Sequence, residues 1–299
     1  MTQSGFVAVV GRPNVGKSTL VNALVGSKVA ITSKRPQTTR NTIRGIVTRS
    51  LDSGEPDSQL VLVDTPGLHK PKTALGERLN SLVYGTLAES DVNLFVLDAT
   101  QPVGPGDRRI AQRLKDAGTP VVVIVNKVDL ASKPTVAERL IEAAEWDFDA
   151  YVPTSALEGD AVEAVAGELF DRIPEGPLYF PPDAISDQPE QQLIGEIIRE
   201  KFLDRLREEL PHSLMVAVRE MEQRDSGTLY VDALVIVERS SQKGIVIGKG
   251  GSMLQTAGAE ARSELETILG TKVFLDLRVR VEKDWQQHPE LLDRLGFVQ

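Results

Sequence analysis

The sequence of 299 residues contains no cysteine, which excludes disulfide bonds, thiolate metal sites and cysteine nucleophiles. Long apolar stretches are missing too: no window of about 18 apolar residues occurs, and the N-terminus lacks a basic start followed by an apolar run. We therefore expect neither a membrane-spanning helix nor a secretion signal, and we expect the protein in the cytoplasm.

Basic residues are in deficit, because 34 Lys and Arg stand against 43 Asp and Glu and the formal net charge is -9. Such a chain does not coat nucleic acid through its overall charge, so any RNA or DNA site must be a local one. Hydrophobic residues at 41% and charged residues at 26% are typical of a folded globular protein. At roughly 150 residues per domain, the length favours two domains.

Short apolar runs alternate with helical patterns over the first half of the chain, which is typical of an α/β domain with a mainly parallel sheet. The runs are apolar throughout, as expected when helices cover both faces of a sheet. Residues 43–50 and 59–63 flank a polar segment with glycine and proline, so we expect an antiparallel hairpin at the sheet edge. We assign residues 1–175 to this domain.

A proline-rich stretch separates the two halves, with five prolines in residues 173–192. Neither a regular helix nor a central strand tolerates this composition, so we assign residues 176–192 to a linker. The pattern beyond it predicts an amphipathic helix, two strands, a glycine loop between helical pieces and a final strand. Residues 193–285 thus form a smaller α+β domain with an antiparallel sheet, followed by a tail at 286–299.

The octapeptide GRPNVGKS, residues 11–18, lies between an apolar run and a helical pattern, the order that a phosphate-binding loop requires. Backbone N–H groups and the helix N-terminus would surround the phosphates, while Lys17 would reach the β and γ phosphates. The Ser18 hydroxyl would ligate Mg²⁺. The alternative is a chance glycine-rich turn.

Three further motifs follow strands in the same domain. In DTPG, residues 64–67, the carboxylate of Asp64 would hold Mg²⁺ and the Gly67 N–H would bond the γ-phosphate. In NKVD, residues 126–129, Asp129 can accept two hydrogen bonds from guanine that adenine does not offer. TSA, residues 154–156, offers backbone N–H groups to the guanine oxygen. Each motif alone could be a turn or a polar loop, but all four occur in order at strand ends, where open α/β sheets bind ligands.

These motifs resemble those of the translation-factor-related class of P-loop GTPases. The resemblance implies that QTTRN, residues 37–41, is the second GTPase motif, with Thr39 rather than Thr38 on Mg²⁺. It also implies switch regions at 28–44 and 64–79. Leu68 stands where many GTPases have a glutamine that orients the attacking water. Some members of the class use K⁺ near the phosphate-loop asparagine, here Asn14, so we expect slow hydrolysis that K⁺ or a partner stimulates.

The predicted site residues follow from these motifs and this resemblance. We assign catalytic roles to Lys17, Thr39 and Gly67, and Mg²⁺ ligation to Ser18, Thr39 and Asp64. The predicted residues that bind GTP or GDP are Gly11, Arg12, Pro13, Asn14, Val15, Gly16, Lys17, Ser18, Asp64, Thr65, Pro66, Gly67, Leu68, Asn126, Lys127, Val128, Asp129, Thr154, Ser155 and Ala156.

The second domain contains GKGG, residues 248–251, whose GXXG pattern allows close approach of the backbone to single-stranded nucleic acid. Alone it could be a glycine-rich turn between helices. The surrounding order of helix, two strands, GXXG between helices and a last strand resembles a type II KH domain. Residues 239–262 carry four basic side chains and one acidic one, a local excess of positive charge. The predicted RNA-binding residues are Lys243, Gly248, Lys249, Gly250 and Gly251.

A GTPase domain followed by a type II KH domain resembles the bacterial Era-type GTPases over residues 6–282. This resemblance implies a GTP-hydrolysing switch that binds the 3′ region of 16S ribosomal RNA and assists assembly of the small ribosomal subunit. It further implies peripheral association with the inner face of the cell membrane, and we expect a monomer. The alternatives are another ribosome-assembly or RNA-modification GTPase, a P-loop phosphotransferase and a nucleotide-independent RNA binder.

Other features have ordinary structural explanations. We interpret the charged run at 199–209 as a solvated helix face with paired side chains. Trp146 and Trp285 are predicted to be core residues rather than stacking platforms. The leucines at 291, 292 and 295 predict a tail that packs on the second domain, and His69 is interpreted as a surface residue of a switch region.

Overall fold

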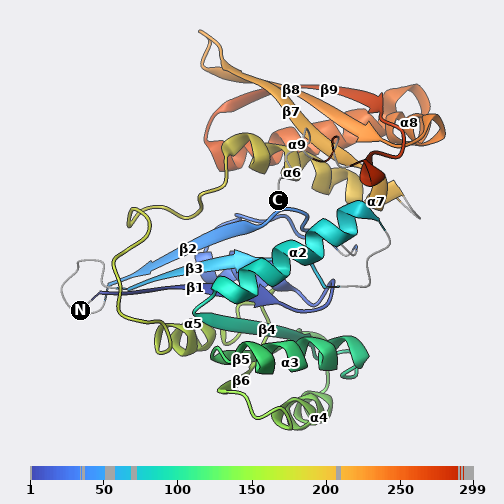
Figure 1. Ribbon diagram of the computed structural model, residues 1–299. Coiled ribbons are helices and arrows are strands. Elements are labelled where there is room, and N and C mark those ends of the chain that lie inside the picture. Colours follow the sequence, from blue (N-terminus) through green and yellow to red (C-terminus); the bar gives the residue numbers. More distant parts are fainter. Residues whose placement is uncertain are drawn as a thin grey trace. The chain divides into compact units, whose positions relative to one another are not determined.

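The computed structural model in Figure 1 describes residues 2–33, 35, 38–50, 58–68, 73–206, 210–288, 290 and 292. Contacts divide the chain into two compact units. The first comprises Met1–Ala30, Thr39–Pro71 and Gly76–Asp187. The second comprises Gln188–Gln299 together with two pieces of the first half, Ile31–Thr38 and Lys72–Leu75.

The first unit contains a six-stranded sheet in the order β2-β3-β1-β4-β5-β6. All neighbouring strands pair in parallel except β2 and β3, which form the antiparallel hairpin predicted for the sheet edge. Each strand of the parallel part is followed by a loop at its carboxyl end, so the motif loops meet along one edge. The strands are β1 (Gln3–Val10), β2 (Ile43–Arg49), β3 (Ser58–Asp64), β4 (Val92–Asp98), β5 (Val121–Asn126) and β6 (Ala150–Thr154).

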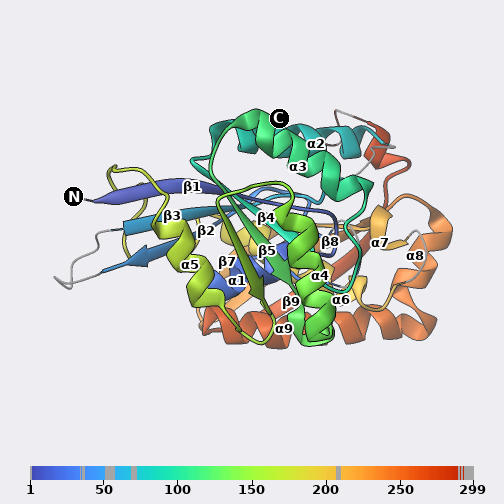
Figure 2. The same cartoon turned by 90° about the horizontal axis from the view of Figure 1, so that it is seen from below.

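Helices cover both faces of this sheet, as Figures 1 and 2 show. One face packs against α1 (Lys17–Val25) and α5 (Val162–Phe170). The other packs against α2 (Ala74–Glu89), α3 (Pro105–Ala117) and α4 (Lys133–Ala144). Every residue of β5 is buried, because its side chains meet helices on both sides. The short helix η1 (Val128–Leu130) follows β5.

Residues 174–187 run without a helix or strand of their own along the first unit. The fully buried side chain of Gln59 accepts hydrogen bonds from the backbone of Tyr179 and Phe180 at 2.9 and 3.0 Å. It also donates to the Phe180 carbonyl at 3.0 Å. Farther along, the Ile185 carbonyl accepts a bond from Ile46 of the edge strand β2. The predicted linker is thus anchored to the first unit as far as Asp187, and a helix already begins at Glu190.

The second unit has a three-stranded sheet in the order β7-β8-β9. β7 is antiparallel to β8, but β9 is parallel to it, so the prediction of an antiparallel sheet was wrong for the last strand. Two helices between β8 and β9 carry the chain back, which lets β9 enter in the same direction as β8. The elements are α6 (Glu190–Leu203), α7 (Leu210–Ser213), β7 (Met215–Gln223), β8 (Thr228–Val237), α8 (Ser240–Ile247), η2 (Lys249–Gly251), α9 (Ser252–Leu269), β9 (Lys272–Val281) and η3 (Trp285–Gln287).

One side of the second sheet forms a core with α6 and α9. Both tryptophans are core residues as predicted: Trp285 is fully buried and donates to the Ser213 carbonyl, and Trp146 is buried in the first unit. Leu292 is also buried, whereas positions 291 and 295 of the predicted tail lie outside the described residues.

The charged run at 199–209 is not a solvated face at its start. Arg199 and Glu200 are 1% and 4% exposed, so that prediction was wrong for them. The cause is the segment Ile31–Thr38, which belongs to the second unit and supplies polar partners that sequence spacing does not reveal.

Candidate functional site

The phosphate-binding loop, residues 11–18, joins β1 to α1 at the carboxyl edge of the first sheet. Gly16 is the N-cap of α1 with a left-handed φ of 99°, and the Leu20 N–H bonds to its carbonyl. Gly67 of DTPG lies against this loop, since a Cβ on it would stand 2.7 Å from the Pro13 nitrogen. Glycine at 67 is therefore needed for the close approach of the two motifs.

Lys17 is buried in the loop, with its ammonium group donating to the carbonyls of Gly11 and Arg12 at 3.2 and 3.0 Å. Burial lowers the pKa of Lys17 to about 8, and the nearby carboxylate of Asp64 opposes this shift. An anion bound in the loop would compensate the desolvated ammonium, as the predicted contact of Lys17 with phosphates requires.

Three oxygen-bearing side chains meet beside Lys17. The Ser18 hydroxyl donates to Asp64 Oδ2 at 2.6 Å, and Thr39 Oγ1 lies 2.9 Å from Ser18 Oγ and 3.2 Å from Asp64 Oδ2. Asp64 Oδ1 is buried without a hydrogen-bond partner among the described residues. Burial raises the pKa of Asp64, against the bonds from Ser18 and the charge of Lys17. This oxygen set and the orphaned carboxylate atom fit Mg²⁺, which prefers oxygen ligands.

Thr38 lies differently from its neighbour. Its hydroxyl bonds to the Arg35 carbonyl at 2.8 Å, so the structure brings Thr39 and not Thr38 to Ser18 and Asp64. Gln37 of the same predicted motif and His69 of the second switch region lie outside the described residues.

Hydrogen bonds connect the NKVD loop to the phosphate-binding loop. Asn126 Nδ2 donates to the Val15 carbonyl at 2.9 Å, and Lys127 Nζ donates to the Asn14 carbonyl at 2.6 Å. Lys127 also pairs with Asp98 Oδ2 at 2.6 Å. These bonds fix the NKVD loop relative to the phosphate-binding loop, so the two predicted parts of the nucleotide site are held together before a ligand binds.

The TSA loop supports the carboxylate of Asp129, which is predicted to read the base. Ser155 Oγ donates to Asp129 Oδ1 at 2.6 Å, and the Ala156 N–H donates to Asn126 Oδ1 at 3.0 Å. Ser155 and the preceding Thr154 are fully buried at the end of β6. The carboxylate of Asp129 is thus oriented before a base binds, as recognition of two guanine N–H groups requires.

Two acidic residues of this neighbourhood were missed at the sequence level. Asp98 ends β4, so the rule that strand ends carry functional side chains could have found it. Asp107, at 1% exposed, pairs with Arg12 at 2.9 Å and accepts a bond from the Gly104 N–H. Nothing in its sequence surroundings marks it, because its partner lies 95 positions away in the chain.

The GKGG loop of the second unit stands between α8 and α9. Gly248, Gly250 and Gly251 have φ of 78°, 61° and 84°, and a Cβ on Gly248 would lie 2.7 Å from the Met253 nitrogen. Lys249 is exposed within this loop, and Lys243 is exposed on α8, five residues before Gly248. The loop therefore offers bare backbone and two cations to a phosphate chain.

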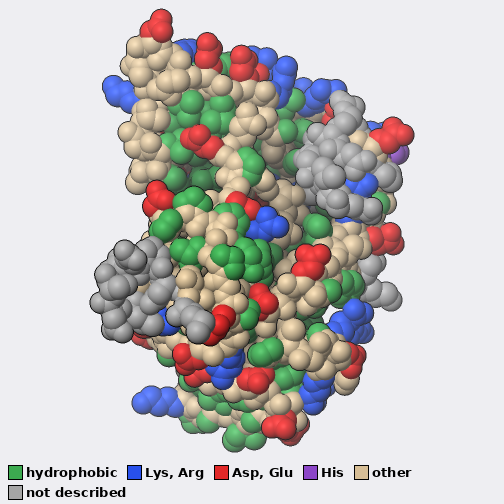
Figure 3. Space-filling view, turned by 60° about the vertical axis from the view of Figure 1, so that its left-hand side comes forward, with side chains coloured by type: hydrophobic (Ala, Val, Ile, Leu, Met, Phe, Trp, Pro, Cys, Tyr) green, Lys and Arg blue, Asp and Glu red, His purple; other side chains and the backbone are tan. Residues whose placement is uncertain are grey.

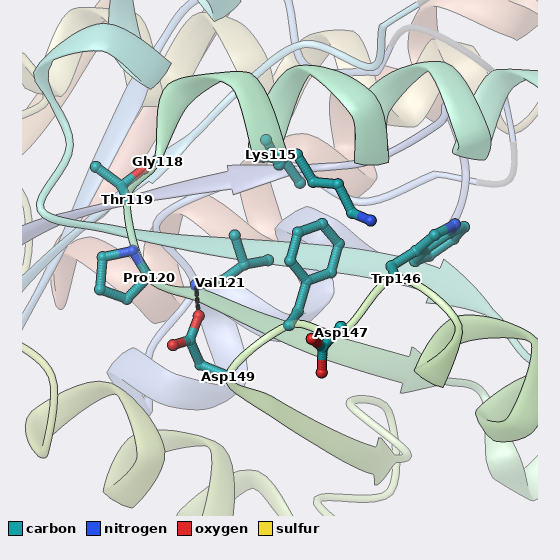
Figure 4. Close-up of a pocket in the computed structure, with 10 residues that line it drawn as sticks. Lys115, Gly118, Thr119, Pro120, Val121, Trp146, Asp147 and Asp149 are labelled. Carbon is teal, nitrogen blue, oxygen red and sulfur yellow. Dashed lines mark hydrogen bonds between the residues drawn. The ribbon is translucent and has the colours of Figure 1, made fainter.

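Charged side chains of both signs are interspersed on the face seen in Figure 3, with no continuous basic surface among the described residues there. An acidic chain of this kind has to bind nucleic acid through a restricted patch, as the sequence indicates. A shallow pocket of about 380 Å³ opens elsewhere, at the start of β5, where Asp149 accepts a bond from the Val121 N–H (Figure 4). Since the motif loops follow the opposite ends of β5 and β6, this pocket is separate from them.

Comparison with known proteins supports the assignment of both halves of the chain. A 50S ribosome-binding GTPase family model matches residues 6–127, and a KH domain model matches residues 209–286. GTPase Era of Mycobacterium avium (strain 104) is 51% identical over 99% of both chains. GTPase Era of Mycobacterium tuberculosis (strain ATCC 25618 / H37Rv) is 51% identical over 98% of both chains.

Two solved structures are similar over the full length of both chains, each with a TM-score of 0.94 and 37% identity. One is a single-residue variant of Aquifex aeolicus Era bound to GDP and aluminium fluoride. The other is Era in complex with MgGDPNP and nucleotides 1506–1542 of 16S ribosomal RNA.

The fold and the site define a P-loop GTPase that carries a C-terminal KH domain, as the sequence predicts. The chain belongs more narrowly to the Era family of these enzymes. It is thus a GTPase, which binds GTP and hydrolyses it to GDP and phosphate. Within the described residues, no helix has the length and apolar character needed to cross a membrane.

Proposed function

We propose that this GTPase binds the 3′ region of 16S ribosomal RNA through the GKGG loop, and that the bound nucleotide controls this binding during assembly of the small ribosomal subunit. The observation that carries the proposal is an exposed glycine loop with two cations in a chain similar over its full length to Era bound to nucleotides 1506–1542 of that RNA. Lys243 and Lys249 contact phosphates, and Gly248, Gly250 and Gly251 let the strand approach the backbone.

The nucleotide site acts as follows. Residues 11–18 and 64–68 surround the phosphates, with Lys17 on the β and γ phosphates and the Gly67 N–H on the γ-phosphate. Ser18, Thr39 and Asp64 hold Mg²⁺, which neutralises charge that develops on the phosphates. Asp129 accepts hydrogen bonds from guanine. The residues around the base are Asn126, Lys127 and Val128, and the neighbouring loop that supports them consists of Thr154, Ser155 and Ala156.

A potassium ion beside Asn14 is the further part of this proposal. The side chain of Leu68 has no polar atom to orient the attacking water, so a glutamine of the kind found in many GTPases is missing at this position. A monovalent cation near Asn14 would stabilise the developing negative charge instead. Hydrolysis then runs faster in K⁺ than in Na⁺, and equal rates in the two salts without any partner would refute this part.

We propose further that the protein is a monomer in the cytoplasm and that it associates peripherally with the inner face of the cell membrane. Residue composition fits a reducing compartment, since there is no cysteine to protect. Co-sedimentation of the purified chain with vesicles of anionic phospholipid tests the membrane part, and recovery in the supernatant at low salt would refute it.

The deciding experiment measures binding of a labelled RNA with the 3′-terminal sequence of 16S ribosomal RNA at fixed salt. Protein is compared with a non-hydrolysable GTP analogue, with GDP and without nucleotide. Tighter binding with the GTP analogue is expected. Equal affinity in all states would remove the nucleotide control, and absence of binding in every state would refute the proposal that this chain binds the 3′ region of 16S ribosomal RNA.

A further inference from the structure

A piece of the GTPase half, Ile31–Thr38, is part of the second unit. Ile31 is 1% exposed and belongs to the apolar core formed with α6 and the second sheet. The Thr32 N–H donates to Glu200 Oε1 at 2.8 Å, and Arg35 Nη2 donates to the Leu206 carbonyl at 2.7 Å. This segment is therefore held to the KH half by apolar and polar contacts together.

Arg199 of α6 binds the end of this segment. Its side chain is 1% exposed, and its Nη2 donates a hydrogen bond to the Thr38 carbonyl. Glu196, one turn earlier on the helix, accepts from Arg199 Nε at 2.9 Å and from Nη2 at 2.6 Å. A two-point pair of this kind fixes the plane of the guanidinium, so the donor that faces Thr38 has one direction.

The next residue, Thr39, belongs to the first unit and touches the metal-site oxygens of Ser18 and Asp64. The peptide bond from Thr38 to Thr39 is thus one of the points where the chain passes from one unit to the other. Because that bond is planar, a fixed Thr38 carbonyl also restricts the orientation of the Thr39 backbone. One side chain of the KH half thereby acts on the residue that would ligate Mg²⁺.

We propose that Arg199, oriented by Glu196, is a positioning residue that couples nucleotide state to the KH half by fixing the Thr38 carbonyl. This inference rests on the proposed function, in which GTP controls RNA binding. Thr39 meets Mg²⁺ only when a γ-phosphate orders its loop, so Arg199 stabilises the GTP state and not the GDP state. Coupling is reciprocal, and an RNA that favours this arrangement of α6 also favours bound GTP.

The test compares affinities for a fluorescent GTP analogue and for fluorescent GDP in the full chain. Arg199→Met keeps an apolar stem of similar length but removes all three hydrogen bonds. We expect affinity for the GTP analogue to fall about ten-fold and affinity for GDP to stay within about two-fold. Arg199→Lys restores one donor and should recover part of the loss.

Arg205→Met is the matched control. Arg205 lies just beyond α6 and donates to Glu260 and to the Lys201 carbonyl, so these bonds connect residues of Gln188–Gln299 and not the segment that ends at Thr38. This variant should leave both affinities unchanged. Equal losses for GTP analogue and GDP in Arg199→Met, or no loss for either, would overturn the proposal. If Arg199→Met does not fold by its thermal melt, Glu196→Gln decides, with a smaller loss expected for the GTP analogue alone.

A measurement of ribosomal RNA binding distinguishes failure of this inference from failure of the proposed function. In the wild-type chain, the ratio of RNA affinities with GTP analogue and with GDP measures the coupling itself. A ratio of one there refutes the proposed nucleotide control, whatever Arg199 does. A ratio above one that persists in Arg199→Met refutes the role of Arg199 and leaves the proposed function standing.

Discussion

Ser155 Oγ donates a 2.6 Å hydrogen bond to Asp129 Oδ1, although the two residues come from loops after different strands. The bond holds one oxygen of the carboxylate and so restricts the orientation of the Asp129 side chain. Asp129 is predicted from its own motif, and the partner that orients it belongs to the next motif, 26 positions later. If Asp129 selects the base as predicted, the selectivity should depend on both residues of this pair.

Replacing Ser155 with alanine should weaken guanine nucleotide binding. The bond is already formed without ligand, so its loss affects binding through the cost of orienting the freed carboxylate, and we expect the Kd for GDP to rise about three- to ten-fold. Isothermal titration with GDP measures this. Asp129→Asn provides the contrast, because an amide can donate to the carbonyl that xanthine has in place of the guanine amine. It should exchange GDP binding for XDP binding, and unchanged GDP affinity in either variant would contradict the assignment.

The pair of Lys127 and Asp98 should contribute stability that depends on pH. Burial alone would raise the pKa of Asp98, but the bonds from Lys127 and Thr100 outweigh it and hold the pKa below its ordinary value of 3.8. A depressed carboxyl pKa contributes stability that is present above 3.8 and is lost as pH falls through the lower, folded value. Asp98→Asn should therefore lower the free energy of unfolding at neutral pH.

Urea unfolding between neutral pH and about pH 3 measures this difference. The gap between wild type and Asp98→Asn should stay constant down to about pH 5 and shrink in more acidic solution. Asp116→Asn is the control, since Asp116 is exposed on α3 and accepts a bond from Gln112. A gap that grows toward acid pH would show that the sign is wrong.

Substitutions of the GKGG glycines should distinguish an effect on folding from an effect on RNA binding. A Cβ at Gly248 would collide with the Met253 backbone at a φ of 78°, so Gly248→Ala should destabilise the KH half by about 1–3 kcal/mol. A Cβ at Gly250 would meet nothing within 4 Å, and aspartate tolerates a φ of 61°. Gly250→Asp should keep the fold and lose about ten-fold in RNA affinity.

Lys249→Asp should weaken RNA binding in the same way, since Lys249 is exposed and its charge is reversed. Filter binding at moderate salt measures the RNA affinity, and GDP titration serves as the internal control because the nucleotide loops are unchanged. Wild-type RNA affinity in both Gly250→Asp and Lys249→Asp would remove this loop from the RNA site.

Most of the fold follows from local patterns in the sequence. The helix at 17–25, the edge hairpin and the order of elements in the KH half are all set by nearby residues. The direction of β9 depends on how two helices cross the sheet, which no strand pattern encodes. The burial of Arg199 and Glu200 depends on a segment more than 160 positions earlier, so a charged run looked like a surface.

The proximity of the four motif loops could be predicted from the sequence for a related reason. Its residues sit in short motifs whose spacing is dictated by a strand, a loop and the phosphate chain, so the letters carry the geometry. The supporting residues lie outside these motifs. Asp107 forms an ion pair with Arg12, and Asp98 forms one with Lys127, between segments that are far apart in the sequence. A residue that orients another side chain needs only to lie near it in space. In the sequence, several polar residues are equally plausible candidates for such a partner.

Gln59 gives the last prediction, which concerns the linker. Its buried amide accepts two backbone N–H groups and donates both to the Phe180 carbonyl and to Thr48 Oγ1 at 3.1 Å. Gln59→Ala leaves backbone groups of Tyr179 and Phe180 without partners, which should cost about 2–4 kcal/mol of stability in the first unit. Gln59→Glu can still accept the two N–H groups, but it cannot donate, and its charge faces the Phe180 carbonyl.

Glutamate should therefore destabilise the first unit as well, and it should do so more at neutral pH than near pH 4, where the carboxyl group takes up a proton and donates again. Urea unfolding at the two pH values measures this, and limited proteolysis reports release of residues 174–187 in both variants. If Gln59→Glu were as stable as wild type at neutral pH, the donor half of the amide would contribute nothing, and the linker would be held by Ser4, Ile46 and the ring of Phe6 instead.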